Sequence, residues 1–338
     1  MGDHTTSVGG MPHRTDSGLF FNPWPGGRQR GLRDFFKWIL GERWRHPRLL
    51  DSNTRLLARA TPAFRTPHAD YDELVVTWIG HTSFLVQIGS ANVLLDPVWG
   101  QRASPVSFAG PRRVVPPGID FDVLPSIDLI VISHDHYDHL DLPTVRRLVR
   151  EHPSARWVAP LGVGAWLRRH DAVVAAELDW WQTVRVGTLE LGCTPARHFA
   201  GRTPYNRDHT LWSGWSIRAG GRAMFFAGDT GRHLEFEKIT QEFGPFDAAF
   251  LPIGAYDPRW LMQPVHMDPA EAVDAYSDIV RANGEKPCTF VATHWGTFKL
   301  ADEPVDEPPR LTREAWRRAG LDEAMLWIPI HGETKTLG

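Results

Sequence analysis

The sequence predicts an α/β sandwich whose functional site lies at one edge of its sheets. Short strand-like runs follow one another over residues 74–95, and residues 127–132 form a nearly continuous apolar run. Beyond this run, strand-like segments alternate with helical ones, and polar residues cluster where strands end. This alternation is typical of sheets covered by helices, and functional residues in such folds lie on the loops that leave the strands.

The composition is that of a globular protein with a sizeable core. Of 338 residues, 42% are hydrophobic and 23% are charged, which is ordinary for such proteins. We expect an N-terminal extension over residues 1–70 and one large domain over residues 71–338. The formal net charge of -3 offers no surplus of Lys and Arg for a nucleic-acid backbone, so nucleic acid is not an expected partner.

Several features bear on the location of the protein. No run of about 18 apolar residues could span a bilayer, and residues 1–16 lack the apolar core of a secretory signal. Cys193 and Cys288 are too few for a disulfide framework and are expected as free thiols. These features favour a cytoplasmic protein, or one that is peripheral on the cytoplasmic face of a membrane.

The N-terminal extension begins with a polar segment, residues 1–17, that is expected to be a disordered tail. Pro23 and Pro25 then enforce extended backbone. In residues 32–40, the apolar side chains at positions 32, 35, 36, 39 and 40 share one helical face. Such a short amphipathic helix packs on its own domain or lies on a membrane surface, and amphipathicity alone does not separate these alternatives.

Within the domain, the first three strands are expected at residues 74–79, 83–88 and 92–95, separated by turn residues. The run at 127–132 has the pattern of a strand buried on both faces. A helix is expected at 142–151, because Pro143 costs little near a helix start. Further strands are predicted at residues 156–159, 188–191, 215–218, 223–227, 248–252 and 289–292, and helices at 163–169, 234–243 and 269–282.

Four metal-type side chains follow the buried strand within six residues: His134, His136, Asp138 and His139. Imidazole nitrogens and carboxylate oxygens are suitable zinc ligands, and a loop leaving a strand can turn alternate side chains towards two neighbouring centres. His134 and His136 can serve one metal, and Asp138 and His139 the other. Without an ion, these groups would repel one another and lose hydration at a high cost, which disfavours a merely polar loop.

Each centre needs further ligands, and three strand ends supply candidates. His198, Asp229 and His294 each follow an apolar stretch. Taken singly, either histidine is equally well explained as a core or surface residue, and Asp229 in Gly-Asp-Thr-Gly as a turn residue. Together with the cluster they complete two sites. These ligand types favour zinc, although iron and manganese also accept them.

The His-x-His-x-Asp-His loop, a later His, an Asp and a final His resemble the motifs of the metallo-β-lactamase superfamily. The resemblance implies an αβ/βα four-layer sandwich. It also implies that His134, His136 and His198 bind one zinc ion, that Asp138, His139 and His294 bind the other, and that Asp229 bridges both.

Further segments are similar to the N-acyl-phosphatidylethanolamine-hydrolysing phospholipase D family. They lie at residues 21–25, 102–105, 110–113, 177–181, 211–216, 252–260 and 294–298. This resemblance implies a dizinc phosphodiesterase of phospholipase D type, which releases an N-acylethanolamine and phosphatidic acid from a phospholipid. Since family members often pair, the resemblance also implies a homodimer. Peripheral membrane contact is a separate expectation, because the helix at residues 32–40 and Arg112-Arg113 could dock on anionic lipid.

The resemblance also implies roles for residues near the metals. Two metals supply hydroxide at neutral pH and clamp the oxygens of a phosphodiester, with Asp229 and Asp138 as catalytic residues beside them. His266 matches a family histidine near the site. We expect it to bind substrate or transfer a proton, with the orientation of a metal ligand as the alternative.

Other residues are expected to shape the site. A substrate-binding wall is expected at Tyr256, Trp260, Met262 and Gln263, although core packing explains many residues of this kind. Supporting roles near the site are expected for His81 and Asp96.

Two departures from the family pattern concern the substrate more than hydrolysis. Asp135 stands where the family commonly has Asn, and Arg197-His198-Phe199 replaces Gln-His-Trp. The alternative hypothesis is therefore a related hydrolase of a soluble phosphodiester or a sugar-phosphate lactone. A third is a non-catalytic, metal-stabilised lipid-binding module, which is disfavoured because a structural site usually closes with four ligands.

Overall fold

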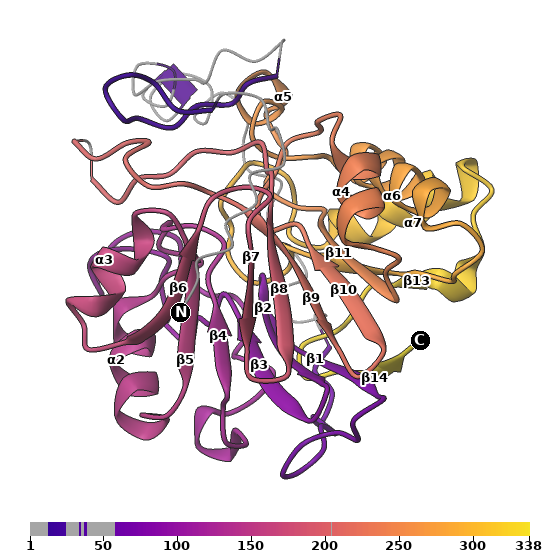
Figure 1. The fold of residues 1–338 in the computed structure, drawn as a ribbon. Coiled ribbons are helices and arrows are strands. Elements are labelled where there is room, and N and C mark those ends of the chain that lie inside the picture. Colours follow the sequence, from indigo (N-terminus) through magenta and orange to yellow (C-terminus); the bar gives the residue numbers. More distant parts are fainter. Residues whose placement is uncertain (1–12, 25–33, 35–36, 39–57, 204) are drawn as a thin grey trace.

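The computed structural model describes residues 13–24, 34, 37–38, 58–203 and 205–338. Two sheets form its centre (Figure 1). The first contains, in spatial order, β14 (Thr334–Leu337), β1 (Leu74–Gly80), β2 (Ser83–Ile88), β3 (Ala91–Leu95), β4 (Leu129–Val131), β5 (Arg156–Pro160) and β6 (Val173–Leu178). The second contains β13 (Leu326–Trp327), β12 (Thr289–Thr293), β11 (Ala248–Pro252), β10 (Arg222–Phe226), β9 (Gly214–Ala219), β8 (Leu189–Thr194) and β7 (Thr183–Val186).

The two sheets face each other across an apolar core. Phe84 of β2 and Phe250 of β11 are fully buried, with their ring centroids 5.0 Å apart. Strands β1, β2, β3 and β4 are buried along their whole length. This explains why their sequences are almost continuously apolar, since strands covered on both faces have no solvent side.

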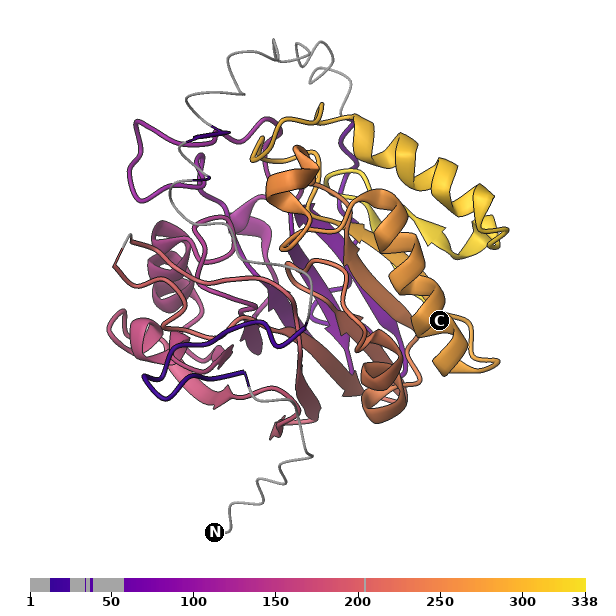
Figure 2. The same cartoon turned by 90° about the horizontal axis from the view of Figure 1, so that it is seen from above.

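Helices cover the outer face of each sheet (Figures 1 and 2). On the first sheet, α2 (Leu142–Glu151) and α3 (Val163–Arg168) bury Leu148 and Leu167 in a core with Ile130 of β4. The outer layer of the second sheet contains α4 (Phe236–Phe243), α6 (Pro269–Asn283) and α7 (Glu307–Arg318), and α6 packs between the other two. The order helix, sheet, sheet, helix confirms the predicted α/β four-layer sandwich.

Within each sheet, several strands run parallel, so their C-terminal ends lie at the same edge of that sheet. In the first sheet, β4 runs parallel to β3 and β5. In the second, β10, β11 and β12 are parallel, and β8 has the same direction because β9 is antiparallel to both β8 and β10. The loops that follow β8, β10 and β12 therefore leave the second sheet at the same edge.

The predicted elements that fall in the described residues agree with the structure to within about two residues at their ends, except that β8 ends three residues later than predicted. The sequence did not predict β6, β7, α7, β13 or β14. Strand β6 alternates between exposed and partly buried residues, so it lacks the apolar run that marks the central strands. Helix α7 carries Pro308 and Pro309 in its first turn and many charged residues, which conceal its helical pattern.

The N-terminal segment of residues 13–24 packs against the sandwich. Its Phe20 and Trp24 are buried and belong to the larger hydrophobic core, and the Phe20 amide donates to the Asp208 carbonyl at 2.9 Å. His13 Nε2 lies 2.7 Å from Asp179 Oδ1. The prediction of a disordered tail is therefore wrong for residues 13–17, because these aromatic and polar contacts hold the segment in place.

Two other expectations concern the membrane and the cysteines. The helix predicted at residues 32–40 lies outside the described residues, apart from Asp34, Lys37 and Trp38. None of the helices in the described part of the chain combines the length and apolar character needed to cross a bilayer. Cys193 and Cys288 are both free and buried.

Candidate metal centre

The loop that follows β4 carries the four clustered candidate ligands. Its path is set by a tight turn, in which the amides of His139 and Leu140 both donate to the His136 carbonyl. His134 and His139 are fully buried, whereas His136 is partly exposed. This loop brings its candidate ligands close to residues from the second sheet.

The remaining candidates come from three strand ends of the second sheet. His198 follows β8, Asp229 follows β10, and His294 directly follows β12. His294 has a positive φ of 61°, which is rare for a residue with a side chain and is found where function or packing demands it. All three side chains are buried and point into the same space as the β4 loop.

One group of ligand atoms contains three imidazole nitrogens. His134 Nε2 lies 2.8 Å from His136 Nδ1, and His198 Nε2 lies 3.2 Å from the same atom. The carboxylate oxygen Asp229 Oδ2 lies 3.9 Å from His134 Nε2 and 3.7 Å from His198 Nε2. The three nitrogens therefore lie within 4.8 Å of one another, and the Asp229 oxygen lies next to two of them.

A second group shares the same carboxylate oxygen. Asp229 Oδ2 lies 3.1 Å from His139 Nε2 and 3.0 Å from His294 Nε2. Asp138 Oδ2 lies 3.4 Å from His139 Nε2 and 3.7 Å from His294 Nε2. Asp229 therefore belongs to both groups.

These distances fit metal coordination. Four ligands at about 2.1 Å from one ion in a tetrahedron are about 3.4 Å from one another, close to the separations in both groups. His139 Nε2, His294 Nε2 and Asp229 Oδ1 are buried without a hydrogen-bond partner among the described residues. Because such atoms are costly to bury unsatisfied, the donor set suits cations better than hydrogen bonding alone.

The charge states also suit a cation. Burial lowers the pKa of His198 to about 3 and that of His136 to about 4, so both imidazoles are neutral and keep a free lone pair. Burial acts to raise the pKa of Asp138 and Asp229, but the neighbouring His139 holds the pKa of both carboxyls well below the usual range. Burial acts to lower the pKa of His294, yet Asp229 raises it to about 9, so this ring holds a proton that a bound cation would displace. The two carboxylates therefore attract positive charge into the site.

Comparison with known proteins places this site in a family. Residues 91–295, more than half of the chain, match the beta-lactamase superfamily domain. The chain is 38% identical over 303 residues to N-acyl-phosphatidylethanolamine-hydrolyzing phospholipase D 1 of Caenorhabditis elegans, covering 86% of this chain and 82% of that protein. The chain belongs to the N-acyl-phosphatidylethanolamine-hydrolysing phospholipase D family of the metallo-β-lactamase superfamily. As a member it is a metal-dependent hydrolase.

Other relatives agree with this membership. An uncharacterised protein of Mycobacterium tuberculosis is 44% identical over 268 residues, which cover 78% of this chain and 69% of that protein. A metal-dependent hydrolase of Saccharolobus solfataricus is 31% identical over 241 residues, covering 70% and 90%. The solved structure of a metallo hydrolase from Ignicoccus hospitalis has a TM-score of 0.58 at 22% identity, covers 79% of this chain and 99% of that one, and supports the fold.

Residues around the metallo-β-lactamase site orient the candidate ligands. Asp96 Oδ2 lies 2.7 Å from His139 Nδ1, and the Asp96 carboxylate also accepts from the amide and hydroxyl of Ser133. His198 Nδ1 lies 2.9 Å from the Val265 carbonyl. Each contact holds Nδ1 of a ring whose Nε2 faces the site, as is usual for metal-bound histidine.

His81, predicted as a supporting residue, lies in direct contact with the candidate ligand Asp138. Its Nε2 is 2.9 Å from Asp138 Oδ2, and its ring nitrogen falls within 4.8 Å of the ligand atoms of Asp138, His139 and His294. Burial lowers the pKa of His81 to about 3, so the ring is neutral. His81 can therefore orient Asp138 or join the second group of ligands.

His266 lies beside both groups. Its ring centroid is 5.0 Å from that of His198 and 5.1 Å from that of His294. The His266 Nδ1 atom is buried and has no hydrogen-bond partner among the described residues. The capping box of α6, formed by Asp268 and Glu271, fixes the backbone just after this histidine.

The predicted substrate wall is only partly open. Trp260 and Met262 belong to the short helix α5 (Arg259–Met262) and are half-buried, and Gln263 is exposed. Tyr256 is buried, and its hydroxyl donates to Glu307 Oε1 at 2.7 Å. A substrate-binding role for these four residues stays a prediction.

One residue that contacts the site did not stand out in the sequence. The side-chain amide of Asn22, in the N-terminal segment, donates to the backbone carbonyl of His198. The only sequence signal was the segment Phe21-Asn22-Pro23-Trp24-Pro25, which carried the family resemblance but indicated no contact with a candidate ligand.

Proposed function

We propose that this protein is a dizinc phosphodiesterase of phospholipase D type, which hydrolyses N-acyl-phosphatidylethanolamine or a similar phospholipid to an N-acylethanolamine and phosphatidic acid. The observation that carries the proposal is the pair of ligand groups that share Asp229 Oδ2. The substrate is proposed from the name of the Caenorhabditis elegans relative, which matches over most of both chains.

The ligand assignment follows the two groups. We assign His134, His136 and His198 to one ion, Asp138, His139 and His294 to the other, and Asp229 to both. When bound, two divalent ions acidify water and neutralise the charge of a phosphodiester. Zinc is the metal that these ligands favour, while iron and manganese accept the same ligands.

Other residues of the chain orient the candidate ligands or face the site where the substrate would bind. Asp96 and the Val265 carbonyl hold the rings of His139 and His198 at fixed angles, which keeps the two groups preorganised. His266 has its Nδ1 free among the described residues and faces both groups. It is placed to donate a hydrogen bond to a phosphate oxygen or to relay a proton from water to the leaving alkoxide.

The wall beside His266 suits a lipid. Trp260 and Met262 are half-buried apolar side chains on α5, next to the exposed amide of Gln263. We assign Trp260, Met262 and Gln263, with Tyr256 behind them, to the lipid-contacting side of the site. Peripheral contact with a membrane would then supply the substrate.

The test is hydrolysis of N-acyl-phosphatidylethanolamine vesicles in ¹⁸O-labelled water, with products analysed by mass spectrometry. Phospholipase D chemistry places the label in phosphatidic acid, because water attacks phosphorus and the ethanolamine oxygen leaves. Metal-stripped protein is the control. Cleavage of soluble phosphodiesters with the lipid left intact would replace this substrate by a soluble one, and label in a released fatty acid would refute phosphodiester cleavage.

A further inference from the structure

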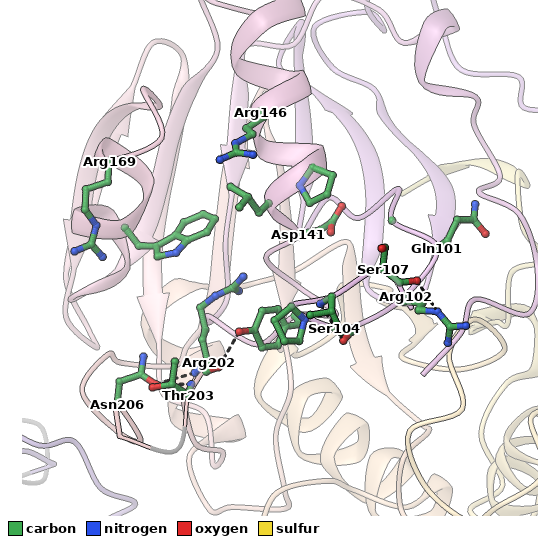
Figure 3. A pocket seen from close by; sticks show the side chains of 17 residues that line it. Gln101, Arg102, Ser104, Ser107, Asp141, Arg146, Arg169, Arg202, Thr203 and Asn206 are labelled. Atoms are coloured by element: carbon green, nitrogen blue, oxygen red, sulfur yellow. Dashed lines mark hydrogen bonds between the residues drawn. The ribbon is translucent and has the colours of Figure 1, made fainter. Parts of the chain in front are cut away.

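A large pocket lies behind the β4 loop, next to the metal centre. Its volume is about 650 Å³, within the range of about 300–1,000 Å³ typical of small-molecule sites. Arg146 of α2, Arg169 at the end of α3, and Arg202 on the loop after β8 line one half of it, while Gln101, Arg102, Ser104 and Ser107 line the other (Figure 3). The pocket contains four arginines and one carboxylate, Asp141.

Two of these arginines are held by the protein. Arg102 donates through Nε to the Ser107 carbonyl and through Nη1 to the Gly110 carbonyl. Arg202 Nη1 donates to the carbonyls of Asp135 and Leu140, both at 2.7 Å. Because the acceptors are neutral carbonyls, neither guanidinium is hydrogen-bonded to a carboxylate in these contacts. Burial lowers the pKa of Arg202, and the charges of Asp135, Asp141 and Asp138 partly offset this effect.

The other two arginines have no such partners. Neither the Arg146 side chain nor the Arg169 side chain makes a hydrogen bond or an ion pair with another described residue. Both side chains are exposed, and they sit on different helices that meet at the pocket. Five donors on each guanidinium are therefore available to a ligand.

The arginine charges of the pocket also act on the neighbouring His170. His170 follows Arg169 and stacks edge-on against Trp166, with ring centroids 4.4 Å apart. Burial lowers the pKa of His170, and the charges of Arg146 and Arg202 lower it further. The one carboxylate is already engaged, since Asp141 Oδ2 accepts from the amide and hydroxyl of Thr144 at the start of α2.

We propose that this pocket binds a phosphate group, with Arg146 and Arg169 as the residues that contact it and Arg202 as a fixed positive charge beneath it. Guanidinium groups bind phosphate oxygens through paired, charge-assisted hydrogen bonds. The Arg146 and Arg169 side chains have no carboxylate partner among the described residues, so no internal ligand competes for these two guanidinium groups. The site is separate from the metal centre, although Arg202 touches the loop that carries the candidate ligands.

Apolar side chains in the walls of the pocket indicate that the ligand also carries an apolar group. Pro105, Val106 and Leu142 line it, and just beyond the rim Phe108 is 81% exposed and Tyr205 is 92% exposed. A phosphate that carries an apolar group fits this surface better than an inorganic ion. The phosphate of a lipid and that of a soluble metabolite share the chemistry that the arginines recognise.

The test compares the variant Arg146→Ala/Arg169→Ala with wild-type holoenzyme. Inorganic phosphate and glycerol 3-phosphate are titrated by calorimetry, and sedimentation is measured with phosphatidylcholine vesicles that contain phosphatidic acid. Loss of several charge-assisted hydrogen bonds should weaken binding about tenfold or more. Any binding at the metal centre remains in the variant, so only the difference between the proteins is assigned to the pocket.

The matched control is Arg150→Ala/Arg185→Ala, which removes the same charge from side chains that are 68% and 71% exposed and lie outside the pocket. Weaker binding of the soluble phosphates only in the pocket variant supports a soluble ligand. Weaker vesicle binding alone in that variant supports a lipid phosphate. Equal binding by wild type and the pocket variant, or an equal loss in the control, would overturn the proposal. Metal content and thermal unfolding establish that each variant is folded.

Discussion

Asn22 Nδ2 donates a 2.8 Å hydrogen bond to the backbone carbonyl of His198, a residue 176 positions further along the chain. The segment that carries Asn22 is fastened on both sides, since the Phe20 amide donates to Asp208 and Trp24 stacks on His233 with ring centroids 4.8 Å apart. The N-terminal segment therefore contributes directly to the position of a candidate metal ligand.

We expect Asn22→Ala to weaken metal binding without unfolding the protein. A hydrogen bond of this kind contributes about 0.5–1.5 kcal/mol, so metal affinity should fall by about twofold to tenfold. The measurement is metal affinity from competition with a chelator at equilibrium. Ser17→Ala, an exposed change in the same segment, is the control. The same affinity in both variants would show that Asn22 does not position His198.

Asp96→Asn should reduce metal affinity or activity by about 10- to 100-fold. The carboxylate is fully buried and lies 2.7 Å from His139 Nδ1, so the change removes an acceptor and alters the orientation of that ring. The measurement is metal content together with the metal dependence of hydrolysis. Asp128→Asn, which disturbs a carboxylate that accepts from the Asn92 amide, is the control. Wild-type metal affinity in Asp96→Asn would contradict the role assigned to Asp96.

Asp229→Asn should abolish turnover and leave the fold largely intact. Asp229 Oδ2 lies 3.0–3.9 Å from four imidazole nitrogens, so the substitution removes the negative charge that both ligand groups share. Hydrolysis is measured at saturating zinc, and circular dichroism monitors the fold. Wild-type kcat in this variant would refute the shared role.

Glu303 predicts a pH dependence of stability. Burial raises the pKa of its carboxyl from 4.5 to about 7, while the amides of Ala255 and Asp257 donate to it. The folded state therefore binds this proton more tightly than the unfolded state. The stability that this proton confers is fully present below about pH 4.5 and is lost as the pH rises through about 7, by about 3 kcal/mol at most.

The measurement for Glu303 is urea unfolding of wild type and Glu303→Gln between pH 5 and pH 8. The difference between the two proteins at each pH removes the titration of the histidines. The stability of wild type relative to the variant should decline as the pH rises. The control is Glu323→Gln, a change at an exposed glutamate, for which the difference in stability from wild type should not vary with pH. A difference that does not vary with pH for Glu303→Gln would contradict the prediction.

The residues differ in how visible they are in the sequence. The His134 to His139 cluster and the central strands were predictable, because ligand spacing and apolar runs are local patterns. The contact between His81 and Asp138 spans 57 residues, and only the pairing of strands brings the two side chains together. Likewise, β14 lies near the C-terminal end of the chain and pairs with β1. Because β14 is only four residues long, its sequence carries no pattern strong enough to predict a strand.

The arginine pocket was not predictable for a related reason. Arg146, Arg169 and Arg202 belong to three separate segments, and each alone resembles an ordinary surface arginine. Only the packing of α2 and α3 beside the loop after β8 reveals that two of them have no partner among the described residues.

The two-metal centre is tested most directly by the metal content of protein purified without chelator, measured by inductively coupled plasma mass spectrometry. We predict two metal ions per chain in wild type and in His209→Ala, an exposed histidine that serves as control. His136→Ala should retain fewer ions and unfold at a lower temperature, because bound metal stabilises the folded state. A wild-type protein without metal that also fails to bind added zinc would contradict the account.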